Sequence, residues 1–119
     1  MINVKQVFKI NAIYKMSKII LSKSKRKGKR LKVEMIDFEG LKNHIHHFGS
    51  DIGSTFIDHK NIQKKNAWIA RHSVSKFWND IHSPLFYSRM LLWKTDNLNK
   101  NIRLLAKQLN TKIINKMNL

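Results

Sequence analysis

The chain has 119 residues, with 24 Lys and Arg against 7 Asp and Glu, a formal net charge of +17 and no cysteine. The length fits one domain, and the lack of cysteine excludes a disulfide-stapled fold, a zinc ribbon, an iron–sulfur protein and a thiol enzyme. No apolar run approaches the length of about 18 residues that a membrane span needs, so no span is expected. A charge this high predicts an acidic partner: nucleic acid, an anionic membrane surface or an acidic protein.

The charge is concentrated at the two ends of the chain. Residues 1–36 carry eleven Lys and Arg against one acid, residues 37–93 carry seven against five, and residues 94–119 carry six against one. We therefore expect a nearly neutral folded body between basic ends. Residues 1–15 are predicted to form a basic arm, either a frayed extension or an interfacial or partner-docking helix. A targeting presequence is disfavoured because the arm has neither Arg nor Ser.

Strand signals come first in the folded part. Two short, β-branched segments lie at 18–22 and 31–36, and the second alternates apolar and charged residues, as a half-buried strand does. The basic run 23–32 between them predicts a hairpin with a cationic loop. A third strand is expected over 43–48.

Helix signals follow the strands. Asp58 is predicted to cap a helix that runs to about Arg71. Ser83 and Pro84 form a strong start signal for a buried helix over 85–93, with Ser as the N-cap and Pro at the first helical position.

The C-terminal segment is amphipathic. A helix is predicted over 97–116 from one apolar stripe, made of Leu98, Ile102, Leu105, Leu109 and Ile113. The order of elements predicts an α+β fold, with a hairpin or three-stranded sheet followed by about three helices in one domain over 16–119.

The main candidate binding site is the basic run 23–32, which holds seven cations in ten residues. Such a run is typical of a phosphate-binding patch or a localisation signal, and a solvated hairpin tip is the alternative. Because no acidic segment offsets the charge, we favour an acidic partner. Cations on the C-terminal helix add to the predicted partner- or phosphate-binding set, which is Lys23, Lys25, Arg26, Lys27, Lys29, Arg30, Lys32, Lys100, Arg103 and Lys107.

Six histidines could supply metal ligands. Three of them together with Asp58 could form a divalent site, and His44 and His46 share a face if their segment is a strand. A His-metal nuclease would draw on a looser set, namely His47, Asn61 and His72. The spacing matches no diagnostic motif, so we favour polar or capping histidines and expect no metal ligand.

No catalytic signature accompanies the histidines. The chain has no Gly-rich phosphate loop and no Gly-x-Ser-x-Gly elbow, and its carboxylates are dispersed. We therefore expect no enzyme activity, no cofactor and no small-molecule substrate. The aromatic residues between 68 and 93 could form a base-stacking platform, but tryptophans in a small domain are more often part of its core, which we favour.

Several short motifs are spaced along the chain. They are Ser24-Lys25-Arg26-Lys27-Gly28-Lys29, His47-Phe48-Gly49, His59-Lys60, Arg71-His72, Trp78-Asn79-Asp80 and Phe86-Tyr87-Ser88-Arg89-Met90-Leu91-Leu92-Trp93. Over residues 16–109 this series resembles a family of small basic proteins of unknown function from nucleocytoplasmic large DNA viruses, the giant viruses of algae and amoebae. The structural motif residues that the resemblance implies are His47, Arg71, Trp78, Asp80, Arg89 and Trp93.

The resemblance implies a virion-associated protein without enzyme activity. Our leading hypothesis is a minor capsid or inner-layer structural protein, which binds other capsid proteins or the anionic inner membrane surface through its basic ends. Its location would be the virion and, during assembly, the viral factory in the host cytoplasm. The alternative is a nucleic-acid-binding protein that packages or organises the viral DNA.

The motif residues also support a prediction about packing. Arg89 falls in the buried helix over 85–93, where an unpaired guanidinium is costly. It is therefore predicted to pair with Asp80, with Trp78 and Trp93 packed around the pair.

Overall fold

The computed structural model describes residues 16–37 and 42–117, so the predicted basic arm over 1–15 lies outside the described residues. The predicted α+β class is confirmed, and three of the four strands precede the helices. In chain order the elements are β1 (Met16–Lys23), β2 (Lys29–Asp37), β3 (Lys42–Ser50), α2 (Phe56–His59), α3 (Ile62–His72), α4 (Pro84–Ser88), the π-helix η1 (Arg89–Trp93), α5 (Leu98–Leu109) and β4 (Lys112–Asn115).

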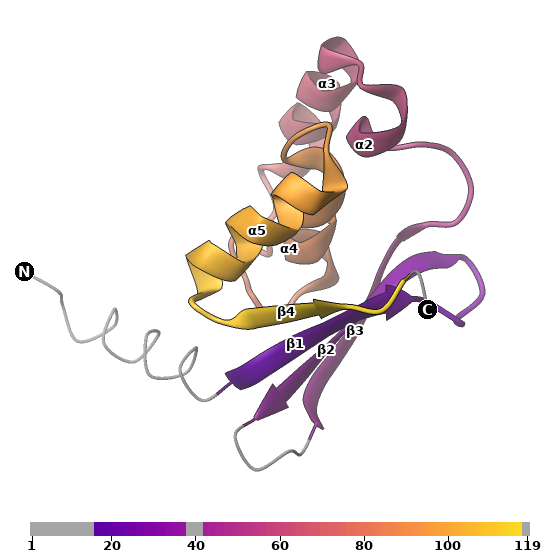
Figure 1. Cartoon of the computed structure of the whole chain (residues 1–119). Helices are drawn as coiled ribbons and strands as arrows, with labels where there is room; N and C mark the ends of the chain where they lie inside the picture. The colour runs from indigo at the N-terminus through magenta and orange to yellow at the C-terminus, as the bar shows by residue number, and fades with distance from the viewer. Residues whose placement is uncertain (1–15, 38–41, 118–119) are drawn as a thin grey trace, which may run out of the picture.

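The strands form one sheet in the order β3-β2-β1-β4. β1 and β2 pair antiparallel as the predicted hairpin, and β3 adds antiparallel to β2 as the predicted third strand. β4 joins the other edge, parallel to β1, after the chain has passed through all the helices (Figure 1).

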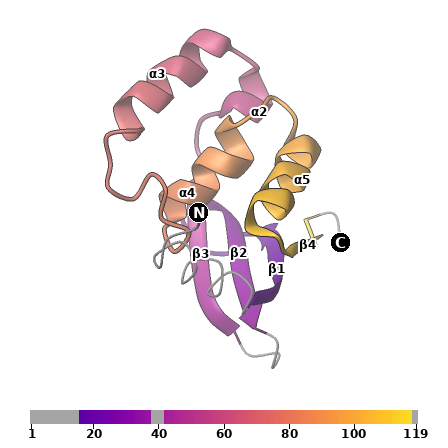
Figure 2. The same cartoon turned by 90° about the vertical axis from the view of Figure 1, so that its left-hand side faces the viewer.

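The helices cover one face of this sheet. Figure 2 shows α4 and α5 against the sheet, with α3 farthest from it. The alternation predicted for β1 and β2 places one set of side chains on the helix face, and helix side chains complete the core. Fully buried members of this core include Ile19, Leu21, Val33 and Met35 from the strands, and Tyr87, Leu91, Leu92 and Leu105 from the helices. None of the helices in the described part of the chain is long and apolar enough to span a membrane.

The predicted start of the buried helix is confirmed. The Ser83 Oγ accepts a hydrogen bond from the Leu85 N–H at 3.1 Å, and Pro84 occupies the first turn. α4 continues directly into η1, and four consecutive residues of η1, Met90 to Trp93, are buried.

Asp58 does not begin a helix, contrary to the prediction. The N-cap of α2 is Thr55, and Asp58 is the acidic partner at the third helical position of a capping box. α2 ends at Lys60 in the left-handed conformation, and Asn61 then caps α3 through a hydrogen bond from the Lys64 N–H. Asp is among the preferred N-cap residues, so the sequence alone indicates a cap at Asp58 and does not show that it stands at the third helical position.

The predicted C-terminal helix over 97–116 is too long. Its predicted start agrees with the structure, where Asn97 caps α5, but Asn110 adopts the left-handed conformation (φ 49°, ψ 48°) and ends the helix. Ile113 instead lies in β4, where it pairs with Ile19 of β1. The helical and the strand interpretations both place Ile113 against the same core, so the apolar stripe alone does not distinguish them.

Candidate functional site

The hairpin loop between β1 and β2 has a defined shape. Its ends are joined by hydrogen bonds from the Ser24 N–H to the Arg30 carbonyl and from the Lys29 N–H to the Arg26 carbonyl, both at 3.1 Å. The Ser24 Oγ accepts from the Arg26 N–H at 3.0 Å. Gly28 takes the positive φ of 82° that closes the turn. Basic side chains are therefore displayed from a hydrogen-bonded loop.

An open cleft of about 520 Å³ lies between this loop and the segment that follows β3. The Asp51 N–H donates to the Gly28 carbonyl at 3.4 Å and so connects the two walls. The basic residues that line the cleft are Lys23, Lys25, Arg26, Lys27, Lys29 and Arg30. Six of the ten predicted binding residues are thus brought together.

Two cations of the basic run are neutralised within the chain. Arg30 forms a bidentate ion pair with Asp58, at 2.6 and 2.8 Å, and the Lys32 Nζ lies 2.7 Å from a carboxylate oxygen of Glu34. The other five, which we call the hairpin cations, form no ion pair with any residue that the structure describes: Lys23, Lys25, Arg26, Lys27 and Lys29. Their charge is left for a partner.

His47 belongs to this site, which the sequence interpretation missed. Its Nδ1 lies 2.7 Å from the Ser24 Oγ, and it pairs with Lys32 across the strands. Burial, and after it the positive charges of Arg26, Lys32 and Lys29, lower the pKa of His47. The resemblance marked His47 only as a motif residue. The pairing register of β2 with β3, which would have placed it here, is not readable from local sequence.

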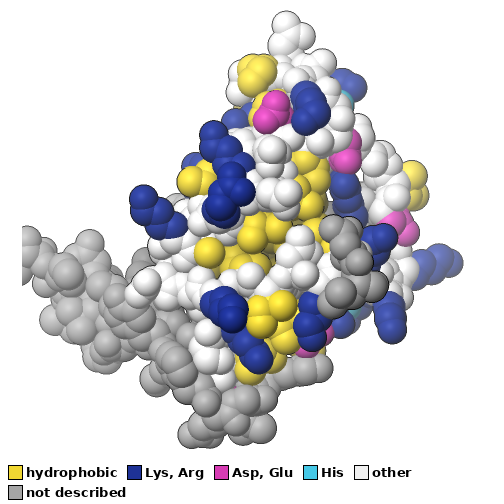
Figure 3. All heavy atoms as spheres, viewed as in Figure 1, with side chains coloured by type: hydrophobic (Ala, Val, Ile, Leu, Met, Phe, Trp, Pro, Cys, Tyr) yellow, Lys and Arg dark blue, Asp and Glu magenta, His cyan; other side chains and the backbone are white. Residues whose placement is uncertain are grey.

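The cations of α5 form a separate surface. Lys100, Arg103 and Lys107 are exposed, and none of them lines the cleft at the hairpin. Figure 3 likewise shows Lys and Arg side chains gathered over α5 and, apart from these, at the end of the sheet that carries the hairpin. The predicted binding set is therefore divided between two places.

The predicted pairing of Arg89 with Asp80 is wrong. The Arg89 Nη1 donates to the Trp78 carbonyl and to the Asn79 Oδ1, each at 2.8 Å, and its guanidinium lies over the Trp78 ring at 4.5 Å. A backbone carbonyl and an amide oxygen thus accept the hydrogen bonds that a carboxylate was predicted to accept. Asp80 has a different partner: its Oδ1 accepts a hydrogen bond from the His82 N–H at 2.9 Å.

The other motif residues lie in an aromatic layer around α3. Trp93 stacks on Trp68 with ring centroids 4.8 Å apart, and Trp68 also stacks on His72. Arg71 is exposed at the edge of a shallow pocket beside these rings. The base-stacking surface considered from the sequence is thus largely internal packing, as we favoured.

The fold and the cleft define a small, basic α+β protein with a cationic hairpin. Residues 19–72, from β1 through α3, match a family of unknown function (DUF5754), so the hairpin cations and β3 lie within the part of the chain that is similar to this family. No curated protein and no solved structure matches the chain.

Proposed function

We propose that the protein is a non-enzymatic nucleic-acid-binding protein that contacts the phosphate backbone through its hairpin. The observation that carries this proposal is the set of five hairpin cations around one open cleft, without an ion pair to the described part of the chain. Lys and Arg donate charged hydrogen bonds to phosphate oxygens, and these contacts do not depend on the base sequence. Binding should therefore be indifferent to base sequence.

Nucleic acid fits this surface better than a single acidic side chain does. The hairpin cations lie on a short loop and on the strand ends beside it, so a partner has to offer several negative charges within a short distance, as a phosphate backbone does. The Arg30–Asp58 pair holds the base of the loop, which limits the conformational entropy lost on binding. For duplex DNA, five phosphate contacts would give a slope of log K against log salt of about −4.5.

Two charge-matched triple variants test the proposal. Lys25→Gln/Arg26→Gln/Lys27→Gln removes three hairpin cations, and Lys100→Gln/Arg103→Gln/Lys107→Gln removes the same three residue types from α5. Binding to a fluorescent duplex of random sequence is measured by anisotropy over a range of salt concentrations. The hairpin variant should bind at least about tenfold more weakly at low salt, with a slope shallower by about 2.7, whereas the α5 variant should change much less.

The comparison of the two variants separates a site from a general charge effect. Equal losses in both would mean that net charge alone drives binding, and the hairpin would then not be the site. Failure of the unmodified chain to bind duplex or single strands at low salt would reject the nucleic-acid proposal altogether.

A structural role in the virion, as a minor capsid or inner-layer component, is the second candidate. This candidate rests on the resemblance of the motifs to the viral family, in which Trp78, Arg89 and Trp93 are residues that here serve the packing of the domain. The basic surfaces would then face acidic capsid proteins or the inner membrane. Mass spectrometry of purified particles of the encoding virus tests this role, and absence of the chain from the particles would reject it.

A further inference from the structure

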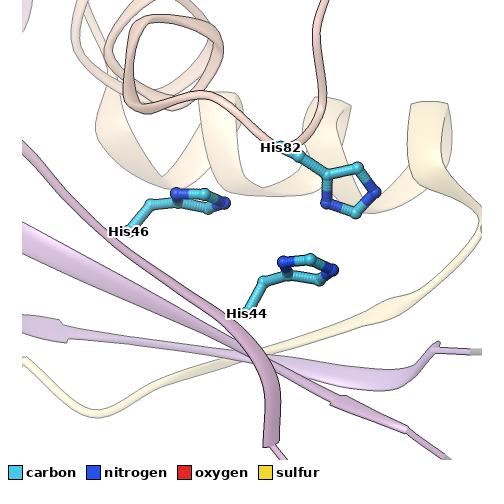
Figure 4. A group of neighbouring side chains, drawn as sticks. All are labelled: His44, His46 and His82. Atoms are coloured by element: carbon cyan, nitrogen blue, oxygen red, sulfur yellow. The ribbon is translucent and has the colours of Figure 1, made fainter.

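Three histidines from two distant segments meet beside β3. His44 and His46 lie on the helix-facing side of β3, opposite Met35 and Val33 of β2, and His82 lies in the loop before α4. One ligand nitrogen from each ring lies within 4.8 Å of the other two. Figure 4 shows the rings turned toward a common space between the strand and the loop.

The surroundings hold these rings in place. His46 stacks on the buried Tyr87 with ring centroids 5.9 Å apart, and the ring centroids of His44 and His82 lie 4.2 Å apart. The hydrogen bond from the His82 N–H to Asp80 fixes the loop that carries the third ring. The cluster is therefore largely formed before any ligand arrives.

An unused nitrogen points to what the cluster can bind. The His46 Nε2 is buried and has no hydrogen-bond partner among the described residues, which is costly unless something else contacts it. Burial, and then the neighbouring His44, lower the pKa of both His46 and His82, while Asp80 raises it. For His46 and His82 the lowered pKa favours neutral imidazole, the form that binds metal.

We propose that His44, His46 and His82 bind one divalent transition-metal ion of the Zn²⁺ class, each through one imidazole nitrogen. Three imidazoles suit this class of ion and leave a fourth position for water or a partner's ligand. The negative charge of Asp80 acts on this part of the cluster and favours a cation there. The bound ion would fasten the loop before α4 to the edge strand β3.

The geometry requires only a small adjustment. Nitrogens on a tetrahedral Zn²⁺ at about 2.05 Å lie about 3.3 Å apart, against separations of up to 4.8 Å between the three ligand atoms. His44 and His82 are exposed and can rotate toward the more buried His46. His47 cannot join them, because it lies on the opposite face of β3 and contacts Ser24.

The test is a titration of the full chain with Zn²⁺ alone, measured by isothermal titration calorimetry. We expect one Zn²⁺ per chain, with affinity lowered at least about tenfold in His44→Gln and in His82→Gln. His47→Gln is the matched control, since it alters the same strand on its other face, and it should leave the affinity unchanged. Circular dichroism confirms that each variant is folded.

Co²⁺ gives a second readout of the same site. Co²⁺ bound to His44, His46 and His82 should show visible d–d absorption. Added Zn²⁺ should displace the Co²⁺ and remove this absorption, and His82→Gln should abolish it. The proposal is overturned if the chain binds no Zn²⁺, or if His44→Gln and His82→Gln bind it as tightly as the unmodified chain does.

Discussion

Arg30 and Asp58 form a bidentate ion pair that joins the base of the cationic hairpin to the first turn of α2. The guanidinium nitrogens lie 2.6 and 2.8 Å from the two carboxylate oxygens. The same carboxylate accepts hydrogen bonds from the Thr55 N–H at 2.8 Å and from its hydroxyl at 2.9 Å. One acidic side chain thus completes the capping box of α2 and positions the loop that carries the proposed binding surface.

Removing the Asp58 charge should weaken both connections. Asp58→Asn loses the ion pair and part of the capping box, and we expect a loss of about 1–2 kcal/mol in the free energy of unfolding. Asp51→Asn is the matched control, because Asp51 lines the same cleft and the charge change is equal. Urea denaturation measures both variants, and an equal effect of the two would show that the pair contributes nothing specific.

The same pair predicts how stability depends on pH. The hydrogen bond from Arg30, with those from Thr55, holds the pKa of Asp58 well below its usual range. A folded-state pKa below the unfolded value of about 3.9 means that the contribution is complete well above that value and is lost as the pH falls through and below it. Urea denaturation between about pH 5 and pH 2 should show this loss, and Asp58→Asn should reduce the slope. A slope that Asp58→Asn leaves unchanged would assign the acid sensitivity to other carboxylates.

Arg89 is expected to stabilise the domain rather than bind a partner. Arg89→Ala removes two hydrogen bonds at 2.8 Å and the stacking on Trp78, which should cost about 1–3 kcal/mol. Arg71→Ala is the control, since Arg71 is exposed on α3 and its change should stay within about 0.5 kcal/mol. Thermal unfolding and the anisotropy assay are measured together. Unchanged stability with lost DNA binding would make Arg89 a surface contact.

Local sequence predicts those parts of the fold that depend on local signals. The alternation in β1 and β2 and the helix start at Ser83–Pro84 each depend on a few neighbouring residues, so the local sequence is enough to predict these elements. The end of α5 is different: β4 gains its hydrogen bonds from β1, far away in the chain, and this long-range pairing overrides a helical periodicity.

The candidate sites divide in the same way. The hairpin cations lie close together in sequence, so the sequence predicts them as one set. His44 and His46 share a strand face, as expected for alternate residues, but His82 joins them only through the path of the loop before α4. The partner of Arg89 was misassigned because the sequence shows which residues carry charge and not which backbone carbonyls become available.

Gly49 gives the last prediction, because two independent constraints act on it. Its φ of 74° lies in the left-handed region, and a Cβ placed there would lie 2.8 Å from the Leu92 Cδ1 and 3.3 Å from the Arg30 Cβ. Gly53 has a similar φ of 88° but has open space around it. Gly53→Ala should therefore cost only the backbone strain, about 1–2 kcal/mol, and Gly49→Ala should cost clearly more, because Leu92 is fully buried and cannot move freely.

A double-mutant cycle isolates the contact. In a Leu92→Ala background the Cδ1 atom is absent, so Gly49→Ala should be less destabilising there than in the unmodified chain, with a coupling of about 1 kcal/mol. Urea denaturation of the four proteins provides the measurement. If Gly49→Ala costs no more than Gly53→Ala, or if the coupling is zero, the close approach of β3 to η1 at this glycine does not constrain the fold.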